Sequence, residues 1–594
     1  MRILSIICVL FFLTFNIYGQ RQSVLKTNKD AYGYNLVPQE KVFVHYNSSL
    51  LFSGEYFYYR VYCFNAKTDA LSTISKVAYL MLLDEDQKAV FKHKIELDKG
   101  LGQGDFFVPV SIPSGNYKLV GYTQWMLNET SRFFQADISI LNPYQGNQNK
   151  ILSADTPQDS LTNAQIEVLK GSELTKVSAE NAKTDLKIST DTKSYEKRSL
   201  VKLTIENTQL NTMGGNYSIS VRKTDPFAKA LPVRAKDFSV MYSNGVKSST
   251  KSVGASVFLP EMRGELIYGK ILSKEAAFSV SEQSVGLSIP GKMSDMKVVL
   301  TDGTGNFVFN VNNRNDRDEV LIQVLGKDRE NYTVQIFEIP EVKPQNLDFY
   351  QFKISPSLKD EIIKRSVHNQ IDNVFYSVKP DTLQALKKAF PFHGTEIETY
   401  VLDDYTRFGT VKETLVEVVE NVWAKKNELG NEVFAVRGYY PTVKKQNFSS
   451  LLVVDGIFVQ DQESIINYDA RKIKSISFIR DRYYLGTQIF EGVVIIETIE
   501  GDYLNSINNS AKITLSSLQT NKKYFRQKYD DDTSYNRIPD FRNQLLWQPN
   551  VKMTKGKSSI EFYTSDVVGD FEICLEGFKD NGFPVSIKTY ITVD

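Results

Sequence analysis

The sequence contains few of the side chains on which many metalloproteins and disulfide-rich proteins depend. Its 594 residues include only three cysteines and four histidines. Cysteine and histidine are the side chains that most transition-metal sites use, so few groups are available for such a site. The cysteine content also excludes a small scaffold held together by several disulfide bonds. We therefore expect hydrophobic cores to stabilise the fold, and the chain is long enough for several domains.

The sequence also lacks the excess of positive charge typical of a nucleic-acid-binding protein and the long apolar run typical of a membrane helix. The 71 lysines and arginines balance the 70 aspartates and glutamates, so there is no electrostatic reason to expect a nucleic-acid or acidic-membrane partner. After the N-terminus no stretch reaches the about 18 apolar residues that suggest a membrane helix. The mature chain is therefore predicted to have no transmembrane segment.

The N-terminus has the features of a secretory signal peptide. One arginine is followed by an apolar run from Ile3 to Phe15 and then by Gly19-Gln20. The run is short for a membrane span, so we assign 1–20 as a signal peptide and expect an exported protein. A lipid anchor would need a cysteine just after the apolar run, whereas Cys8 lies inside it. We therefore expect no lipid anchor.

Export would place Cys63 and Cys574 in an oxidising compartment, where two thiols can pair. They lie far apart in the chain, on different predicted strands. Separate, unreactive thiols are therefore favoured, and a disulfide bond between them is the alternative.

Most of the chain has the residue pattern of short β-strands. Between Val42 and Tyr122, runs rich in aromatic and β-branched residues alternate with turn sequences such as PSGN. Such spacing is typical of a β-sandwich. The segments EKVFVHYNSSLLFSGEYFYYRVYCF and KGLGQGDFFVPVSIPSGNYKLVGYTQWMLN resemble the first macroglobulin-type domain of large envelope proteins from Bacteroidota. The resemblance covers about residues 35–145, and we assign 21–147 to this domain.

A second sandwich of this type is predicted from two separate segments. In DLKISTDTKSYEKRSLVKLTIEN, apolar residues alternate with polar ones from Val201 to Ile205. The two or three strands expected here cannot close a sandwich alone. Residues 555–594 have the alternation and the GDF turn that resemble the second half of a macroglobulin-type domain. We therefore predict one discontinuous sandwich from 184–262 and 555–594, preceded by a linker at 148–183.

The region inserted into this sandwich begins with a smaller β unit. In VVLTDGTGNFVFNV, residues 302–305 supply the turn of a hairpin, and 263–345 is assigned to an immunoglobulin-like β domain. A helical connector is expected at 346–393. Residues 511–554 are assigned to a linker segment, in which Trp547 is expected to be packed rather than ligand-binding.

The segment 394–510 carries the clearest motif. In TVKETLVEVVENVWAKKN, apolar residues occur at helical spacing from Val411 to Trp423, so we expect an amphipathic helix that covers a sheet. Leu451 to Val454 is an apolar run suited to a buried strand, and Asp455-Gly456 turns the chain.

The order of these elements resembles the plug domain of TonB-dependent outer-membrane receptors. Arg437-Gly438 follows one strand, Asp455-Gly456 makes a hairpin, 473–479 follows a short helix, and Gly492 opens a closing strand that ends at Thr498. We therefore assign 394–510 to a plug-like domain. Its structural and candidate interaction residues are Arg437, Gly438, Asp455, Gly456 and Gly492.

The plug of such receptors is followed by a large barrel. A barrel of about 22 strands needs several hundred residues, and only residues 499–594 follow here. The resemblance therefore implies a plug-like domain that is free-standing or acts against a barrel made by another protein.

No catalytic constellation occurs in the sequence. His45, His93, His368 and His393 lack a zinc-site spacing such as H-E-x-x-H, and neither a G-x-S-x-G elbow nor a G-x-x-x-x-G-K-[ST] loop is present. His45 is expected to be structural. Asp530 to Asp532 could hold calcium, but without the spacing of a calcium loop a solvated acidic turn is favoured. We therefore predict no enzyme activity, no cofactor and no metal.

Together these assignments predict a mainly β protein, with tandem macroglobulin- and immunoglobulin-like sandwiches and an inserted small α/β plug-like domain. The resemblances imply a non-enzymatic interaction or scaffold protein of the cell envelope. Its partner would be an outer-membrane barrel protein, such as a TonB-dependent transporter, a secretion channel or barrel-assembly machinery. It would lie in the periplasm, at the outer membrane or on the cell surface.

Two alternatives to a scaffold remain open from the sequence. They are a surface adhesion protein and a noncovalent protease inhibitor of the macroglobulin kind. Covalent trapping is disfavoured, because neither Cys63 nor Cys574 lies in a Cys-Gly-Glu-Gln thioester sequence.

Overall fold

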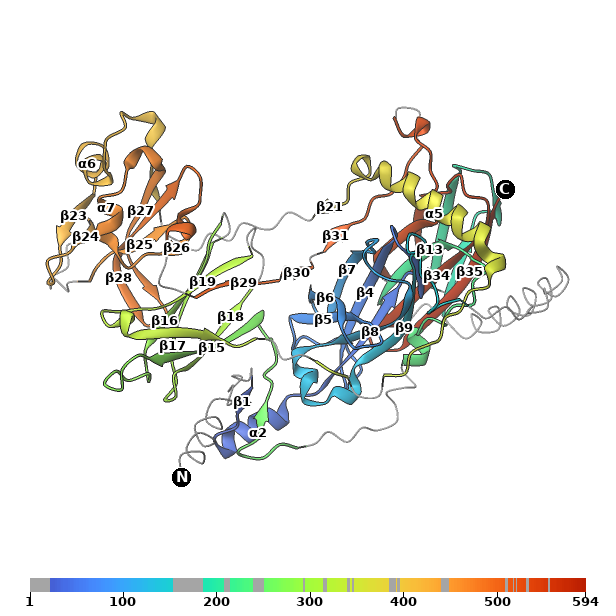
Figure 1. The fold of residues 1–594 in the computed structure, drawn as a ribbon, viewed down its shortest axis with the longest axis horizontal. Coiled ribbons are helices and arrows are strands. Elements are labelled where there is room, and N and C mark those ends of the chain that lie inside the picture. The colour runs from blue at the N-terminus through green and yellow to red at the C-terminus, as the bar shows by residue number, and fades with distance from the viewer. Residues whose placement is uncertain are drawn as a thin grey trace, which may run out of the picture. The chain divides into compact units, whose positions relative to one another are not determined.

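The computed structural model describes most of the chain, which forms two compact units (Figure 1). The described residues are 22–152, 185–207, 214–238, 250–291, 294–312, 318–338, 342–344, 347–383, 392, 396–439, 448–507, 511–516, 518–519, 521–529, 534–553 and 556–594. One unit, which we call the sandwich unit, contains Gln22–Met262, Val342–Ala385 and Leu518–Asp594. The other contains Arg263–Glu341 and Leu386–Ser517, and we call it the plug unit only because it includes the segment predicted to be plug-like. The predicted signal peptide, most of the linker 148–183, His393 and Asp530 to Asp532 lie outside the described residues.

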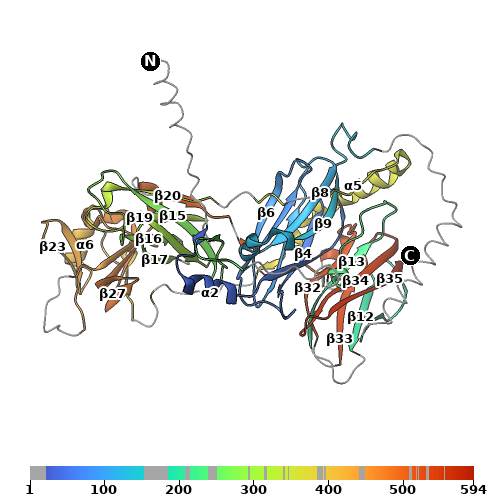
Figure 2. The same cartoon turned by 90° about the horizontal axis from the view of Figure 1, so that it is seen from below.

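The fold is mainly β, as the sequence predicts, and the sandwich unit begins with a β-sandwich (Figure 2). One sheet has the order β2-β4-β7, formed by Glu40–Tyr46, Tyr56–Asn65 and Leu101–Phe107. The other has the order β3-β9-β8-β5-β6-β30, formed by Leu50–Phe52, Phe134–Leu141, Gly115–Tyr122, Val77–Leu83, Ala89–Glu96 and Leu518–Gln519. Beside them lie β1 (Ser23–Val24), α2 (Asn28–Leu36) and β14 (Ser256–Val257).

The second sandwich combines strands from distant parts of the chain. One sheet has the order β10-β12-β33, formed by Leu186–Thr190, Leu200–Asn207 and Lys557–Tyr563. The other has the order β11-β35-β34-β13-β32, formed by Ser194–Tyr195, Pro584–Val593, Gly569–Lys579, Gly215–Lys223 and Gln544–Met553. Leu203 lies opposite Ile560, and Ile219 lies opposite Leu575. The two segments predicted to share a sandwich therefore pair directly, around one core of apolar side chains.

The linker predicted at 511–554 is wrong over much of its length. Gln544–Met553 forms β32, an edge strand of the five-stranded sheet. Pro549 obscures this strand in the sequence, because proline cannot donate to a sheet ladder. The structure accommodates Pro549 at the sheet edge, where the register shifts between Tyr217 and Ile219 of the neighbouring strand.

A helix from the middle of the chain also belongs to the sandwich unit. The helix expected in the connector 346–393 is α5, Lys359–Val374. It is followed by β21 (Thr382–Leu383), which pairs with β31 (Lys522–Lys523). Among the described residues, no helix has both the length and the apolar character needed to cross a membrane.

The plug unit begins with the predicted immunoglobulin-like β domain. Its smaller sheet has the order β18-β15-β20, formed by Asn306–Val311, Glu265–Ser273 and Tyr332–Ile336. Its larger sheet has the order β17-β16-β19-β29, formed by Asp295–Leu300, Ser284–Ile289, Glu319–Val324 and Ala511–Thr514. Because β29 comes from the predicted linker 511–554, the plug-like segment is inserted before the last strand of this domain.

The plug-like segment forms a mixed sheet with helices on one face. The sheet order is β22-β27-β28-β25-β26, formed by Glu398–Val401, Ile473–Leu485, Gln488–Thr498, Leu451–Val454 and Ile457–Phe458. The hairpin β23–β24 (Val422–Lys426 and Glu432–Val436) and the helices α6 (Val411–Glu417) and α7 (Gln462–Ile466) pack on one face. The other face packs on Met296 and Leu325 of the immunoglobulin-like domain. Leu451–Val454 is buried on both faces, which explains its continuous apolar sequence.

The helix predicted from Val411 to Trp423 is shorter than expected. It begins with a capping box made by Thr410 and Glu413 but ends at Glu417. Asn421 then takes a left-handed conformation with φ 66°, and the next residues form β23. The valines of this run favour a strand because their branched side chains lose freedom in a helix.

Candidate protein-interaction surface

Asp455 and Gly456, two of the predicted motif residues, form the turn between β25 and β26. Both have positive φ angles, 50° and 82°. The Asp455 carboxylate accepts hydrogen bonds from the Thr498 amide (2.8 Å), the Thr498 hydroxyl (2.6 Å) and the Tyr503 amide (3.1 Å). A Cβ on Gly456 would lie 2.5 Å from the Cβ of Ser294 in the immunoglobulin-like domain. This turn therefore fixes one end of the sheet and permits close domain packing.

Gly492 lies at the opposite end of the pairing between β25 and β28. Its φ is 84°, close to a bulge where the β27–β28 register shifts between Ile479 and Arg482. A Cβ here would lie 2.7 Å from the Cβ of Val436 and 2.9 Å from the carbonyl oxygen of Ile479. Glycine therefore allows β24 to cross close to β28.

Arg437 and Gly438 follow β24 and are exposed. The Arg437 amide donates to the Asn421 carbonyl (2.8 Å), and the Arg437 carbonyl accepts from Nε of Arg480 (2.7 Å). The Arg480 guanidinium lies 4.2 Å from the centre of the Tyr439 ring. The structure thus brings Arg437 close to Arg480 and Tyr439, two residues that no local sequence pattern indicates.

Trp423 extends this exposed group along the neighbouring hairpin. It pairs with Ala435, two residues before Arg437, and its side chain is 43% exposed. Tyr439 is 41% exposed. We call Trp423, Arg437, Tyr439 and Arg480 the Arg437 surface. The sequence predicts Trp423 on the apolar face of a helix, whereas the structure places it on β23 with its side chain exposed.

Among the residues that the structure describes, a strand edge without a further partner borders the Arg437 surface. β22 pairs with β27 on one side and is the end strand of the plug sheet. Glu398 on β22 lies 3.7 Å from the Arg480 guanidinium. Its neighbours alternate between half-buried and exposed positions. Edge strands of this kind can pair with another chain through their main-chain groups.

Buried charge in the sandwich unit has a structural role. The Glu55 carboxylate accepts from Arg365 Nε (2.8 Å) and Nη2 (2.9 Å) of α5 and from Arg222 Nη2 (2.7 Å) of β13. Burial alone would raise the pKa of Glu55, but the charges of Arg365 and Arg222 outweigh it and lower the pKa. Arg365 also lies 3.3 Å from Asp225. These ion pairs hold α5 against both sandwiches.

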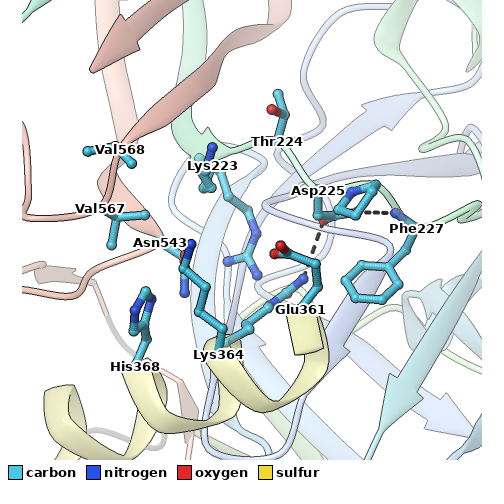
Figure 3. Close-up of a pocket in the computed structure, with 13 residues that line it drawn as sticks. Lys223, Thr224, Asp225, Phe227, Glu361, Lys364, His368, Asn543, Val567 and Val568 are labelled. Atoms are coloured by element: carbon cyan, nitrogen blue, oxygen red, sulfur yellow. Dashed lines mark hydrogen bonds and ion pairs between the residues drawn. The ribbon is translucent and has the colours of Figure 1, made fainter. Parts of the chain in front are cut away.

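A small pocket of about 60 Å³ lies beside these ion pairs. Figure 3 shows Glu361, Lys364 and His368 extending from α5 into the pocket, which Lys223 and Asp225 also line. The imidazole of His368 stacks on Phe541, with ring centres 4.6 Å apart. The pocket therefore adjoins groups that already hold the helix in place.

The two other described histidines are separate; His45 is buried and His93 is half-buried. His45 Nδ1 lies 2.6 Å from the Ser218 hydroxyl, and burial lowers its pKa to about 3. Burial also lowers the pKa of His93 to about 4. Trp547 is buried and packs on the His45 ring, with ring centres 5.2 Å apart. Within the described part of the chain, no three histidine, cysteine or acidic side chains are placed to share a metal ion.

Cys63 and Cys574 are free cysteines in the structure. Burial raises the pKa of both thiols well above its ordinary value. Both thiols are therefore protonated at neutral pH and are weak nucleophiles, as the sequence analysis favoured.

Comparisons with known proteins find similarity in structure and not in sequence. No protein-family model matches this chain, and no curated protein is similar to it. A Salmonella alpha-2-macroglobulin reacted with methylamine is similar over 94% of this chain, with 8% identity and a TM-score of 0.23. The E. coli alpha-2-macroglobulin in its native conformation is similar over 97%, with 11% identity and a TM-score of 0.23. This chain spans 40% of the length of each macroglobulin.

An adhesin is also among the similar structures. The E. coli adhesin FdeC is similar over 46% of this chain and 65% of its own, with 12% identity and a TM-score of 0.13. TM-scores and identities this low do not assign the chain to a family.

Proposed function

We propose that this chain is an exported, non-enzymatic interaction protein of the cell envelope, whose plug-like domain binds an outer-membrane barrel protein. The Arg437 surface is the observation that carries the proposal. Arginine, tyrosine and tryptophan are enriched among the interface residues that contribute most to the binding free energy. Here Arg437, Tyr439 and Trp423 are exposed, and the half-buried Arg480 lies beside them, at the Arg437-Gly438 pair that the plug resemblance singled out.

The arginine at the centre of this surface is held in position before any partner binds. Arg480 donates to the Arg437 carbonyl, stacks on the Tyr439 ring and lies near Glu398. A side chain that is already ordered loses less conformational entropy on binding, so its contacts contribute more to affinity. This arrangement favours recognition over a freely solvated arginine.

The open edge of β22 gives the partner a second means of attachment. An extended segment can add to a sheet edge through main-chain hydrogen bonds, and neighbouring side chains then supply specificity. β22 lies beside Arg480, so one bound segment would contact both.

Three titratable groups of the sandwich unit have surroundings that suit a structural role. The buried carboxylate of Glu55 is paired with two arginines, and His45 and His93 are held neutral inside the sandwich unit. General acid–base catalysis instead needs a titratable group within reach of a bound substrate.

The proposal is tested by purifying the tagged chain from the membranes of its own cells in mild detergent. We expect a stoichiometric outer-membrane barrel protein with the wild type, and its loss with Arg480→Glu. Arg471→Glu is the matched control, because Arg471 is an exposed arginine of the same domain that pairs with nearby Asp469 and lies outside the Arg437 surface. A chain recovered alone, or equal loss with both variants, would refute the proposal and favour a surface or inhibitory role.

A further inference from the structure

The small pocket beside α5 gathers charged side chains from several elements of the sandwich unit (Figure 3). Its volume of about 60 Å³ exceeds the space that one water molecule needs. Four cationic and two anionic side chains line it, and these are Arg222, Lys223, Lys364, Arg365, Asp225 and Glu361. We call it the α5 pocket.

The buried carboxylates at the α5 pocket are already paired with cations. The Glu55 carboxylate accepts from both Arg222 and Arg365. The Asp225 carboxylate accepts from Arg365 Nη1 (3.3 Å) and from Lys229 Nζ (3.1 Å). Three cations therefore share two carboxylates, and this group carries a net positive charge.

Two lysines from different elements also line the pocket. Lys223 is the last residue of β13, and Lys364 lies on α5. The exposed Glu361, one turn before Lys364 on the helix, supplies the one further carboxylate of the lining. The side chains of the pocket therefore carry more positive than negative charge, which favours a negatively charged ligand.

Uncharged donors accompany these cations. Asn543, just before β32, lines the pocket, and its side-chain nitrogen Nδ2 is buried without a hydrogen-bond partner among the described residues. Buried polar groups are normally paired, so Nδ2 needs an acceptor that the described chain does not supply. Burial and the charge of Lys364 lower the pKa of His368, so its ring is neutral at pH 7 and donates from one nitrogen.

We propose that the α5 pocket binds a small oxyanion of the phosphate type, either free or as the terminal phosphate group of a larger molecule. The anion accepts hydrogen bonds from Lys223, Lys364 and Asn543, which belong to three separate elements. Donors in several directions suit the tetrahedral oxygens of phosphate better than the two oxygens of a planar carboxylate. This inference does not depend on the barrel-binding role of the Arg437 surface.

Titration calorimetry of the full chain with inorganic phosphate tests the proposal, at an ionic strength held constant with chloride. We expect the wild type to bind phosphate. Lys364→Gln should bind it at least about tenfold more weakly, or by about 1.4 kcal/mol, because a charge-assisted donor is lost. Glu361→Gln should bind it more tightly, because a charge of the same sign as the anion is removed. No binding by the wild type would overturn the proposal.

The same helix offers a matched control. Lys359 is an exposed lysine of α5 that lies outside the lining of the pocket. Lys359→Gln should therefore keep the phosphate affinity of the wild type. Equal weakening by Lys359→Gln and Lys364→Gln would show attraction to the helix in general and would contradict a defined site. Acetate that binds as tightly as phosphate would contradict the preference for a tetrahedral anion.

Melting curves show whether the variants fold and whether phosphate acts at the pocket. Lys364 is exposed, so Lys364→Gln should melt like the wild type in chloride. Phosphate should raise the melting temperature of the wild type but not that of Lys364→Gln, because a ligand stabilises only the form that binds it. An equal increase for both proteins would place the phosphate elsewhere and refute the proposal.

Methyl phosphate distinguishes the two sources of the anion. Binding of methyl phosphate with the affinity of inorganic phosphate supports a terminal phosphate group of a larger molecule. Binding of inorganic phosphate alone supports the free ion.

Discussion

The guanidinium of Arg480 stacks on the ring of Tyr439 at 4.2 Å from its centre. The two residues come from the long strand β27 and from the segment after β24, and the Arg437 carbonyl joins them through Arg480 Nε. This contact orders an arginine and an aromatic ring on an exposed surface. The proposed role of the plug-like domain follows from it.

The stacking itself predicts a difference between two substitutions of Tyr439. Tyr439→Ala removes the ring face and should weaken binding of the copurified barrel protein by roughly 2- to 30-fold, since cation–π contacts contribute about 0.5–2 kcal/mol. Tyr439→Phe keeps the ring face and should bind like the wild type. Titration calorimetry with the purified partner measures both. An equal loss for Phe and Ala would show that the hydroxyl, not the ring, matters.

Replacing Gly492 should destabilise the plug-like domain through a backbone clash. Gly492→Ala places a Cβ 2.7 Å from Val436 in a position with φ 84°. Strain at positive φ costs about 1–2 kcal/mol, and overpacking adds about 1–3 kcal/mol. Gly430→Ala is the control that measures the backbone strain without the clash. Gly430 has φ 85°, and a Cβ there meets nothing within 4 Å. Urea denaturation should show the larger loss for Gly492→Ala, and equal losses would contradict the clash.

Removing the Asp455 carboxylate should loosen the end of the plug sheet. Asp455→Ala leaves the amides of Thr498 and Tyr503 and the Thr498 hydroxyl without their acceptor. Hydrogen bonds to charged groups contribute about 1.5–3 kcal/mol each, so we expect at least about 2 kcal/mol of lost stability. Asp455→Asn keeps an acceptor and a side chain that tolerates φ 50°, so it should lose less. Faster amide exchange at Thr498 and Tyr503 in Asp455→Ala is the local readout.

The buried Glu55 predicts a pH dependence in the sandwich unit. Its pKa is lower in the folded chain than in the unfolded chain, because Arg365 and Arg222 outweigh burial. Its stabilising contribution is therefore present above the unfolded pKa of about 4.3 and is lost as the pH falls toward the lower folded pKa. The melting temperature of the wild type should decrease as the pH is lowered across this window. The melting temperature of Glu55→Gln should depend less on pH.

Glu55→Gln should also destabilise the chain at pH 7, by about 3–5 kcal/mol, since it removes the carboxylate that Arg222 and Arg365 share and leaves Arg365 only its longer contact with Asp225. The control is Glu206→Gln. Glu206 forms an exposed pair with Lys557, and such pairs contribute about 0–1 kcal/mol. Similar losses for both variants would show that the buried pairs do not hold α5.

The sequence predicts correctly those elements whose conformation depends mainly on residues adjacent in the chain. The continuous apolar run Leu451–Val454 and the Asp455-Gly456 turn are placed as expected, because both depend on neighbouring residues. β32 was missed because Pro549 is tolerated only through its place at a sheet edge. That place depends on pairing with β13, more than 300 residues earlier in the sequence.

The candidate surface was only partly predictable for the same reason. Arg437-Gly438 stood out through its resemblance to plug domains. Arg480 did not, because its contact with the Arg437 carbonyl spans 43 residues and leaves no local pattern. Trp423 was assigned to a helix, because the sequence does not show that Asn421 adopts φ 66° and ends the helical region.

Site-specific photocrosslinking in living cells tests the central claim most directly. A photoreactive phenylalanine analogue at Trp423 lies on the Arg437 surface, and one at Tyr32 on α2 is an exposed control in the sandwich unit. We predict a crosslink from position 423 to an outer-membrane barrel protein, and none to that protein from position 32. No crosslink at 423, or the same crosslinked proteins from both positions, would contradict the proposed role of the plug-like domain.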